Sequence, residues 1–408
     1  PYQKELYKNT IIEQKQLAAK YAAHLLTRQN LSADDYYFLG MLHQIIENND
    51  AATEALEKFL SSESPNPAKA QNARSILVIF AARQKNFDKA EEILAEYQKN
   101  EPIKLSERSK MAYILMQGYR AEKNYPKAVL HAQEAYRLSK ALFKEWSSRS
   151  RALNEILGAA LDVFDIYRTS RNYTEADAIL DDLRKTGVLV ESNSLYFSAL
   201  DRKIKYLVET GRKPLALKLY AESFEQLKKD FASKTLQDDI ERSLKKRETH
   251  YKILGETAPE LRDIEKWFPG QNQTFSDLRG KVILLDFWAT WCGPCIAAFP
   301  SLIEWHNKHQ KDGLVILGIT RYYREIEGKK ADENAEIEFL LNFRKTHNLP
   351  YDFLVANGQA NQIIYGANSI PTAVLIDRKG IIRYVESGTS ASRELEIQKE
   401  IERLLNEE

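Results

Sequence analysis

A five-residue segment that begins with Asn and ends with Ala recurs through the first 250 residues of the chain. Its clearest copies are Asn86-Phe87-Asp88-Lys89-Ala90, Asn124-Tyr125-Pro126-Lys127-Ala128 and Asn172-Tyr173-Thr174-Glu175-Ala176, and weaker copies lie at 48–52 and 212–216. The alanines stand 38, 38, 48 and 40 residues apart. A period of about 40 residues with two helices per unit is typical of stacked helical hairpins. The sequence therefore predicts an all-α helical-hairpin repeat array over residues 1–250.

The residues between these turns have the periodicity of amphipathic helices. One apolar stripe has the spacing i, i+3, i+4, i+7 and i+8, and it consists of Met111, Ile114, Leu115, Gly118 and Tyr119. The array resembles tetratricopeptide repeats, although its units are longer and lack most of that consensus. An irregular helical bundle is the alternative interpretation. Repeat arrays offer a concave surface, so we expect this region to bind a protein partner.

The pattern changes near residue 255, where Gly and Pro interrupt the helical periodicity. We predict that residues 251–273 form a linker that leads into a second domain over residues 274–408. The apolar run from Val282 to Trp288 is typical of a strand that is buried on both faces of a sheet. Further predicted elements are a strand at 315–319, a helix at 334–346, a strand at 373–376, a turn at 377–380, a strand at 381–385 and a helix at 392–406. This alternation, which ends in a hairpin and a helix, predicts an α/β fold with a mixed sheet.

The chain has only two cysteines, Cys292 and Cys295, and they lie in one motif. A fold that depends on structural disulfides has more cysteines, and they are spread along the chain. This pair therefore indicates a catalytic role or a metal site. His306 and His309 superficially suggest zinc. Eleven helical positions from Cys295 to His306 span about 16 Å, whereas zinc ligands lie about 2.0–2.3 Å from the ion. We therefore expect no metal and no other cofactor, and we expect both histidines to be solvated residues at the end of a helix.

The segment from Asp286 to Cys295, which reads Asp-Phe-Trp-Ala-Thr-Trp-Cys-Gly-Pro-Cys, resembles the active-site stretch of thioredoxin. The resemblance covers about residues 256–408 and implies a thiol–disulfide oxidoreductase with a redox-active Cys292–Cys295 disulfide. Cys292 would begin a helix, where the helix dipole and free N–H groups favour the thiolate. It would attack the substrate, and Cys295 would resolve the mixed disulfide. The Gly-Pro pair of reducing thioredoxins implies a low potential.

The same resemblance implies a substrate-binding surface. In the thioredoxin fold the proline that corresponds to Pro371 is cis and faces the active-site sulfurs, and the preceding backbone pairs with a substrate strand. The expected substrate-binding residues are Trp291, Gly293, Pro294, Ile370, Pro371 and Thr372. Pro300 is expected to kink the helix and to have no catalytic role.

Asp286 interrupts an apolar strand six residues before Cys292. A carboxylate in that position would lose its solvation, which raises its pKa. Such a group suits a proton acceptor for Cys295, and thioredoxin has an Asp with this role at the matching position. The alternative is a buried acid with a purely structural role.

The longer outline of the second domain resembles the TlpA/ResA-like branch of extracytoplasmic bacterial reductases. The residues that carry the likeness are 255–259, 275–280 and an extended stretch over 320–350. That branch has a Glu at the position of Ala298 and an Asn at the position of Asp286, so its substrate specificity does not transfer to this chain. Within the stretch, Arg321, Tyr322, Tyr323 and Arg324 are expected to form a solvated loop, and a substrate-binding surface is the alternative.

The formal net charge of +1, without a long basic run, argues against nucleic acid as a partner. The sequence contains no apolar stretch of about 18 residues, so it predicts no membrane span. Because the chain begins at Pro1 without Met, we expect an upstream segment to have been removed, and any membrane anchor would lie there.

The predicted function is reduction of disulfides in protein substrates, with electrons from an upstream thiol donor and outside the cytoplasm. A cytoplasmic location is the alternative compartment. A binding scaffold with a subsidiary thioredoxin-like domain is the alternative function. A peroxidase is disfavoured, because its reactive cysteine would not need a partner three positions further on.

Overall fold

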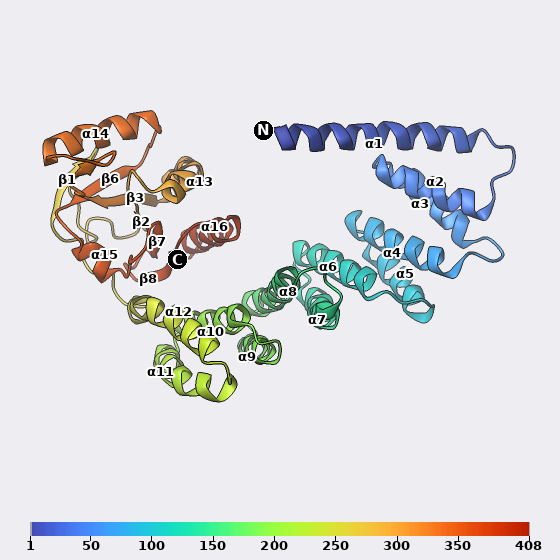
Figure 1. Ribbon diagram of the computed structural model, residues 1–408, viewed down its shortest axis with the longest axis horizontal. Helices are drawn as coiled ribbons and strands as arrows, with labels where there is room; N and C mark the ends of the chain where they lie inside the picture. The colour runs from blue at the N-terminus through green and yellow to red at the C-terminus, as the bar shows by residue number, and fades with distance from the viewer. Residues whose placement is uncertain (1, 408) are drawn as a thin grey trace. The chain divides into compact units, whose positions relative to one another are not determined.

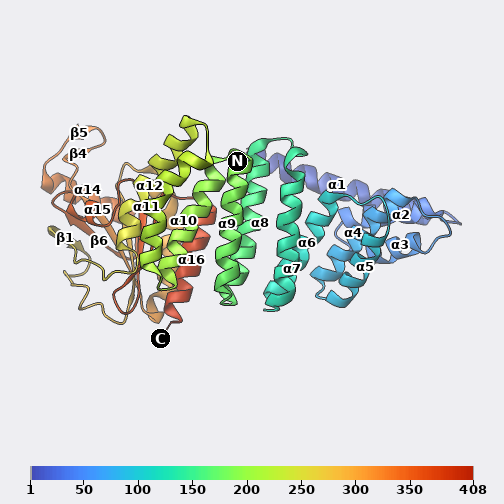
Figure 2. The ribbon, with the colours of Figure 1, turned by 90° about the horizontal axis from the view of Figure 1, so that it is seen from below.

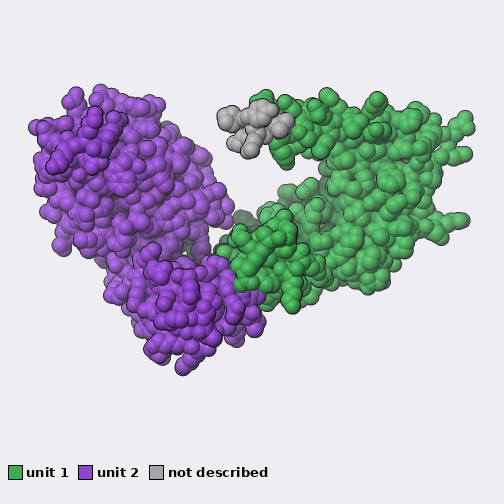
Figure 3. All heavy atoms as spheres, viewed as in Figure 1, with its two compact units in different colours: residues 1–183 green, residues 184–408 purple. Residues whose placement is uncertain are grey.

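The computed structural model describes residues 2–407. Contacts group the chain into two compact units, residues 1–183 and residues 184–408 (Figure 3). The second unit contains the end of the helical region as well as the sheet. The domain limits at residues 250 and 273 stay predictions. No helix among residues 2–407 is long and apolar enough to cross a membrane.

Helices follow one another through the first unit, as the sequence predicts (Figure 1). They are α1 (Tyr2–Leu26), α2 (Ala33–Ile45), α3 (Asn49–Leu60), α4 (Pro67–Arg83), α5 (Phe87–Lys99), α6 (Leu105–Ala121), α7 (Tyr125–Ala141), the short 3-10 helix Leu142–Lys144, α8 (Arg149–Thr169) and α9 (Tyr173–Leu189), which crosses into the second unit. Figure 2 shows α6, α7 and α8 as neighbours.

The recurring segment is the turn between the two helices of a hairpin. Asn86 is the N-cap of α5, and its side chain accepts a hydrogen bond from the Lys89 N–H. Lys85, directly before it, has a left-handed φ of 62°, which ends α4 and reverses the chain. Ala90 is fully buried, and its helix α5 packs on the preceding helix α4. The same arrangement occurs at Asn48 and at Asn124, so the repeat in the sequence corresponds to a repeated capped turn.

The second unit begins with helices and continues into alternating strands and helices. The helices are α10 (Asn193–Glu209), α11 (Lys213–Asp230), α12 (Lys234–Ile253), α13 (Gly293–His309), the 3-10 helix Gln310–Asp312, α14 (Glu333–Thr346), α15 (Ala360–Ile364) and α16 (Ala391–Leu405). The strands are β1 (Ile264–Phe268), β2 (Val282–Phe287), β3 (Leu314–Arg321), β4 (Glu325–Ile326), β5 (Lys329–Lys330), β6 (Asp352–Ala356), β7 (Thr372–Ile376) and β8 (Ile382–Ser387).

Six strands of the described chain form a mixed sheet in the order β1-β6-β3-β2-β7-β8. The central strand β2 is parallel to β3 and antiparallel to β7, and all six of its residues are buried. Its side chains alternate between two cores. Leu284 packs in the core that contains Cys295 and helix α13, whereas Leu285 belongs to the core that contains Tyr251 of α12. Burial on both faces explains the unbroken apolar run of this strand.

Two strands of the sheet are not predicted by the sequence pattern. β1 lies within residues 251–273, which we predict to be a linker. It is an edge strand that pairs with β6. Its charged residues Glu265 and Lys266 interrupt the apolar pattern by which a strand is recognised. β6 itself was not predicted. The other predicted strands and helices of this domain are present, with limits that differ by at most two residues.

A buried charge cluster joins α10 and α12 to the sheet. Glu386 on β8 forms ion pairs with Lys205 of α10, with Arg247 of α12 at 2.6 Å and with Arg393 of α16 at 3.1 Å. Burial would raise the pKa of Glu386, but the three cations hold this pKa far below its usual range. A buried carboxylate with matched cations is costly to disrupt, so the cluster fixes these helices against the sheet.

Candidate redox site

The two cysteines lie where β2 passes into α13. Cys292 is the N-cap of α13 with an extended backbone, and its sulfur accepts a hydrogen bond from the Cys295 N–H at 3.2 Å. The positive end of the helix dipole also points at this sulfur. Both influences stabilise a thiolate on Cys292 once the pair is reduced.

Cys292 and Cys295 are joined by a disulfide in this structure, with Cα atoms 5.3 Å apart. Both residues are buried, with 4% of Cys292 and 1% of Cys295 exposed. Cys292 is therefore the slightly more exposed residue of the pair. Gly293 and Pro294 form the exposed first turn of α13, where Pro is tolerated because the N–H that it lacks has no partner inside the helix. Pro300 lies inside α13 as predicted.

The loop before β7 lies at the same end of the sheet as Cys292, because Thr372 at the start of β7 pairs with Phe287 at the end of β2. The Ile370–Pro371 peptide bond is cis, as the resemblance implies. The Pro371 carbonyl accepts a hydrogen bond from the Gly388 N–H at 2.7 Å, and the Thr372 hydroxyl donates to the Ser369 carbonyl at 2.6 Å. These bonds hold the loop in a defined position beside the disulfide.

Trp291 is 63% exposed directly before Cys292, which leaves a large apolar surface for a partner. Its ring meets Tyr323 edge-on at 5.3 Å, and the guanidinium of Arg321 lies 4.2 Å from the centre of the Tyr323 ring. A cavity of about 380 Å³ adjoins Trp291 between the β4–β5 hairpin and α14, and Glu325 and Glu327 are among its lining residues.

The expectation of a solvated loop over 321–324 is wrong. Tyr322 is buried, and the buried carboxylate of Glu336 on α14 accepts hydrogen bonds from the N–H groups of Tyr323 at 2.8 Å and of Arg324 at 3.1 Å. A carboxylate that satisfies two backbone donors orders the segment, and sequence patterns give no sign of this long-range cap.

Asp286 lies on the sheet face that α13 covers, two positions after Leu284. It is 4% exposed, and burial raises its pKa to about 7. Tyr351 is buried in the same core, and burial together with the charge of Asp286 raises the pKa of its hydroxyl. A carboxyl group with a pKa near 7 can accept and release a proton at neutral pH.

His309 is buried, so the expectation that it would be solvated is wrong. Its Nδ1 lies 3.3 Å from the Asp312 carboxylate, and its ring packs near the end of α13. His306 is half-buried. Within residues 2–407, no group of three or more His, Cys, Asp and Glu side chains is arranged to hold a metal ion.

Helix α12 brings side chains to the loop before Pro371, which sequence reasoning did not anticipate. His250 donates a hydrogen bond from Nε2 to the Gly366 carbonyl at 2.8 Å, because a carbonyl can only accept. No short motif marks His250 for this contact, which joins residues 116 positions apart.

Known proteins are similar to the C-terminal part of this chain. The sequence profile of the AhpC/TSA family matches residues 254–385. The thioredoxin-like protein YneN of Bacillus subtilis is 30% identical over 142 residues, which cover 35% of this chain and 76% of that protein. The thiol-disulfide oxidoreductase ResA of Geobacillus thermodenitrificans is 28% identical over 144 residues, which cover 35% of this chain and 74% of that protein. A solved thiol:disulfide interchange protein of the thioredoxin family from Chlorobium tepidum is 21% identical over 37% of this chain and 96% of its own, with a TM-score of 0.30.

A mixed sheet with a cysteine pair at the start of a helix and a cis proline beside it defines a thioredoxin-like domain. The chain belongs to the thioredoxin-like family of thiol–disulfide oxidoreductases, in which the relatives named above are found.

Proposed function

We propose that this protein reduces disulfides of protein substrates by dithiol–disulfide exchange. The observation that carries the proposal is the placement of Cys292 at the N-terminus of α13, next to the cis-proline loop and the exposed Trp291. The Cys292 thiolate attacks one substrate sulfur, forms a mixed disulfide and releases the other substrate sulfur as a thiolate. The Cys295 thiolate then attacks the Cys292 sulfur, which frees the reduced substrate and leaves the Cys292–Cys295 disulfide. Two electrons from an upstream thiol donor restore the dithiol.

In this mechanism Asp286 takes the proton of Cys295 before the second step. Its support is burial in the core that contains Cys295, with a pKa near 7 that suits proton exchange at neutral pH. Ile370, Pro371 and Thr372 would bind the substrate strand through their backbone, and Trp291, Gly293 and Pro294 would contact it on the other side of Cys292.

The reduction potential of the Cys292–Cys295 pair tests the direction of the reaction. We expect a value closer to the about −270 mV of thioredoxin than to the about −120 mV of a strong disulfide oxidant, because Gly and Pro separate the cysteines as in reducing thioredoxins. The measurement is equilibration of the protein with glutathione buffers, followed by quantification of the free thiols. A potential near −120 mV would show that the protein forms disulfides instead.

We also propose that the helical region binds a partner, which brings that partner to Cys292. In the first unit a cavity of about 570 Å³ lies along α6, α7 and α8, and Lys110, Tyr113, Trp146 and Arg151 are among its lining residues. The Arg151 guanidinium lies 4.5 Å from the centre of the Trp146 ring. The buried Trp146 Nε1 has no hydrogen-bond partner among the described residues, so a bound segment could supply one.

A charge reversal in this cavity tests the partner proposal. Lys110→Glu together with Tyr113→Ala should lower the yield of the partner that a Cys295→Ser variant captures by several-fold, because both residues line the cavity. Reduction of insulin should stay unchanged, since insulin needs only the redox site. Lys123→Glu, an exposed change in the same unit but outside the cavity, is the matched control. Unchanged capture would contradict a role for this cavity. Capture without any reductase activity would favour the scaffold function.

We further propose that the protein works outside the cytoplasm. The support is the resemblance of its second domain to extracytoplasmic reductases. Capture of cytoplasmic proteins alone by the Cys295→Ser variant in growing cells would contradict this location.

A further inference from the structure

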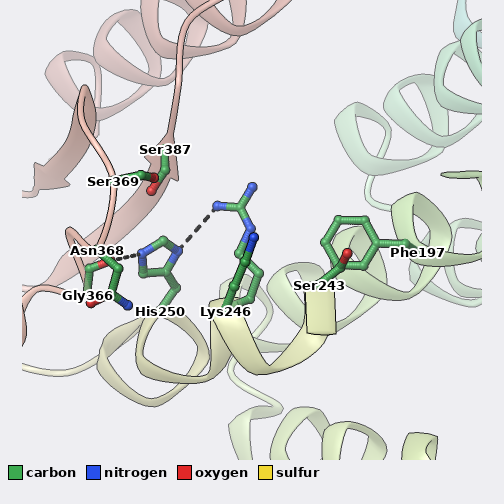
Figure 4. Close-up of a pocket in the computed structure, with 9 residues that line it drawn as sticks. Phe197, Ser243, Lys246, His250, Gly366, Asn368, Ser369 and Ser387 are labelled. Carbon is green, nitrogen blue, oxygen red and sulfur yellow. Dashed lines mark hydrogen bonds between the residues drawn. The ribbon is translucent and has the colours of Figure 1, made fainter. Parts of the chain in front are cut away.

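A second cavity of the second unit adjoins the cis-proline loop and has a volume of about 370 Å³. Figure 4 shows it between the side chains of α12, the Phe197 ring of α10 and the loop that carries Asn368 and Ser369. Its lining residues are Phe197, Ser243, Lys246, Arg247, His250, Gly366, Asn368, Ser369 and Ser387. The cavity therefore combines the helical region and the thioredoxin-like sheet in one surface.

The cavity lies within reach of a substrate strand on the cis-proline loop. Ser369 precedes Pro371 by two residues, and an extended chain advances about 3.3–3.6 Å per residue, so the two positions are at most about 7 Å apart. Ser387 also lines the cavity, and its hydroxyl is 2.8 Å from the Thr372 hydroxyl. A substrate segment that pairs with Ile370 would thus enter the cavity within two or three residues of its cysteine.

The charge of the cavity is positive. Lys246 and Arg247 line it, and none of its described lining residues is acidic. Lys246 is exposed at the mouth and forms no ion pair among the described residues. Arg247 is held in place by Glu386 and by the Nδ1 atom of His250, but Glu386 shares its single negative charge among three cations.

His250 adds no charge of its own. Its Nε2 hydrogen is used by the Gly366 carbonyl, so Nδ1 is left to accept from Arg247. Burial lowers the pKa of His250 to about 4, and it is therefore neutral under ordinary conditions. The Ser369 hydroxyl and the Asn368 amide supply hydrogen-bond donors, while Phe197 supplies an apolar wall (Figure 4). The Ser243 hydroxyl already donates to the Asp239 carbonyl at 2.8 Å, and the Ser387 hydroxyl is paired with that of Thr372.

The cavity on the Trp291 side of the disulfide has the opposite charge, because Glu325 and Glu327 line it. A cationic cavity therefore adjoins the cis-proline loop, and an anionic cavity adjoins Trp291. A substrate segment that carried an acidic residue on one side of its cysteine would match this distribution in one chain direction only.

We infer that the cavity lined by Lys246 and Arg247 of α12 is a specificity subsite for protein substrates. It binds a carboxylate-bearing side chain that lies a few residues from the substrate cysteine. The carboxylate would lie against Lys246 and Arg247 and accept from the Ser369 hydroxyl and the Asn368 amide, while its aliphatic stem would contact Phe197. The inference rests on the proposed reductase function and names the chemical class of substrate that this function prefers.

Reduction of peptide disulfides tests the inference. Each peptide carries Glu, Gln or Lys two to four residues from the cysteine, before it or after it, and has an amidated C-terminus so that the side chain is the only variable carboxylate. On one side of the cysteine, wild-type kcat/KM should fall from Glu to Gln and from Gln to Lys by about two- to five-fold at each step, as for a partly exposed charge pair. Salt should reduce the differences.

Two variants on α12 assign the preference to the cavity. Lys246→Glu should reverse the order of the peptides, because it places a negative charge at the mouth. Lys245→Glu changes the neighbouring exposed lysine, which pairs with Glu241 and lies outside the cavity, and it should keep the wild-type order. A peptide with a free C-terminal carboxylate in place of Glu shows whether the chain terminus serves equally well.

The outcomes separate this inference from the proposed function. Equal rates for the Glu, Gln and Lys peptides, or the same preference in Lys246→Glu, would overturn the subsite and leave the reductase function intact. A wild-type protein that reduces none of the peptides would overturn both.

Discussion

A Cys292→Ser variant should lose all catalysed reduction of insulin and leave only the rate of dithiothreitol itself. The reason is that Cys292 is the N-cap of α13 and the more exposed residue of the pair. A serine hydroxyl is far less acidic than a thiol and does not form a disulfide, so the helix dipole cannot compensate for the change. Precipitation of reduced insulin chains, followed by turbidity, measures the rate.

Cys295→Ser should behave differently, because it keeps the attacking thiol and removes the resolving one. It should accumulate a stable mixed disulfide with its substrate, visible as a higher-mass band that dithiothreitol removes. The chain has no other cysteine, so every such adduct is at Cys292. The double variant Cys292→Ser/Cys295→Ser is the control that should form no adduct. Insulin reduction by Cys292→Ser at the wild-type rate would refute the mechanism.

Asp286→Asn should make the oxidised protein more stable, and the gain should grow with pH. Burial raises the pKa of Asp286 from 3.8 to about 7, so the folded protein holds a proton that the unfolded chain releases. The retained proton of Asp286 contributes to the free energy of unfolding. This contribution is fully present below pH 3.8 and is lost as the pH rises to about 7. The difference between these pKa values corresponds to about 4 kcal/mol at 1.36 kcal/mol per pH unit.

Urea unfolding of the oxidised protein at pH 4 and at pH 8 measures this effect. The variant and the wild type should be similar at pH 4, and the variant should be more stable by up to about 4 kcal/mol at pH 8. Asp277→Asn is the matched control, because Asp277 is exposed and its hydrogen bonds with Thr274 lower its pKa. That change should bring no gain at pH 8. A gain for Asp286→Asn that is equal at both pH values would contradict the buried neutral acid.

Asp286→Asn should also resolve the mixed disulfide about 10²-fold more slowly than the wild type. This factor is the low end of the range for general acid–base catalysis. The pH dependence of this step near pH 7 should disappear, since Asn cannot accept a proton. Stopped-flow measurement of the second step isolates it from the first attack. An unchanged pH profile would assign Asp286 a structural role only.

The redox motif could be predicted because its geometry is local. Cys292 and Cys295 are separated by three positions, and the helix start between them is set by Gly293, Pro294 and the preceding apolar strand. The repeated turns of the helical region are local in the same sense. Asn86 caps α5 through a hydrogen bond that spans three residues, so the pattern is visible without the fold.

The partial failures have a common physical cause. His309, the Tyr322 segment and edge strand β1 acquire their surroundings from residues far away in the chain, such as Glu336 and strand β6. Hydrophobic periodicity describes which face of an element is buried, but it does not say which polar group will meet a particular backbone N–H.

The helical repeat, the mixed α/β domain and the cysteine pair could be predicted from the sequence, because each depends on periodicity or spacing within a few residues. The ion pairs of Glu386 with cations of α10, α12 and α16, and the contact of His250 with the loop before Pro371, are seen only after folding. These contacts join residues between 7 and 181 positions apart. Packing of the elements selects such partners, so the charge of the surface beside the redox site becomes visible only in the folded chain.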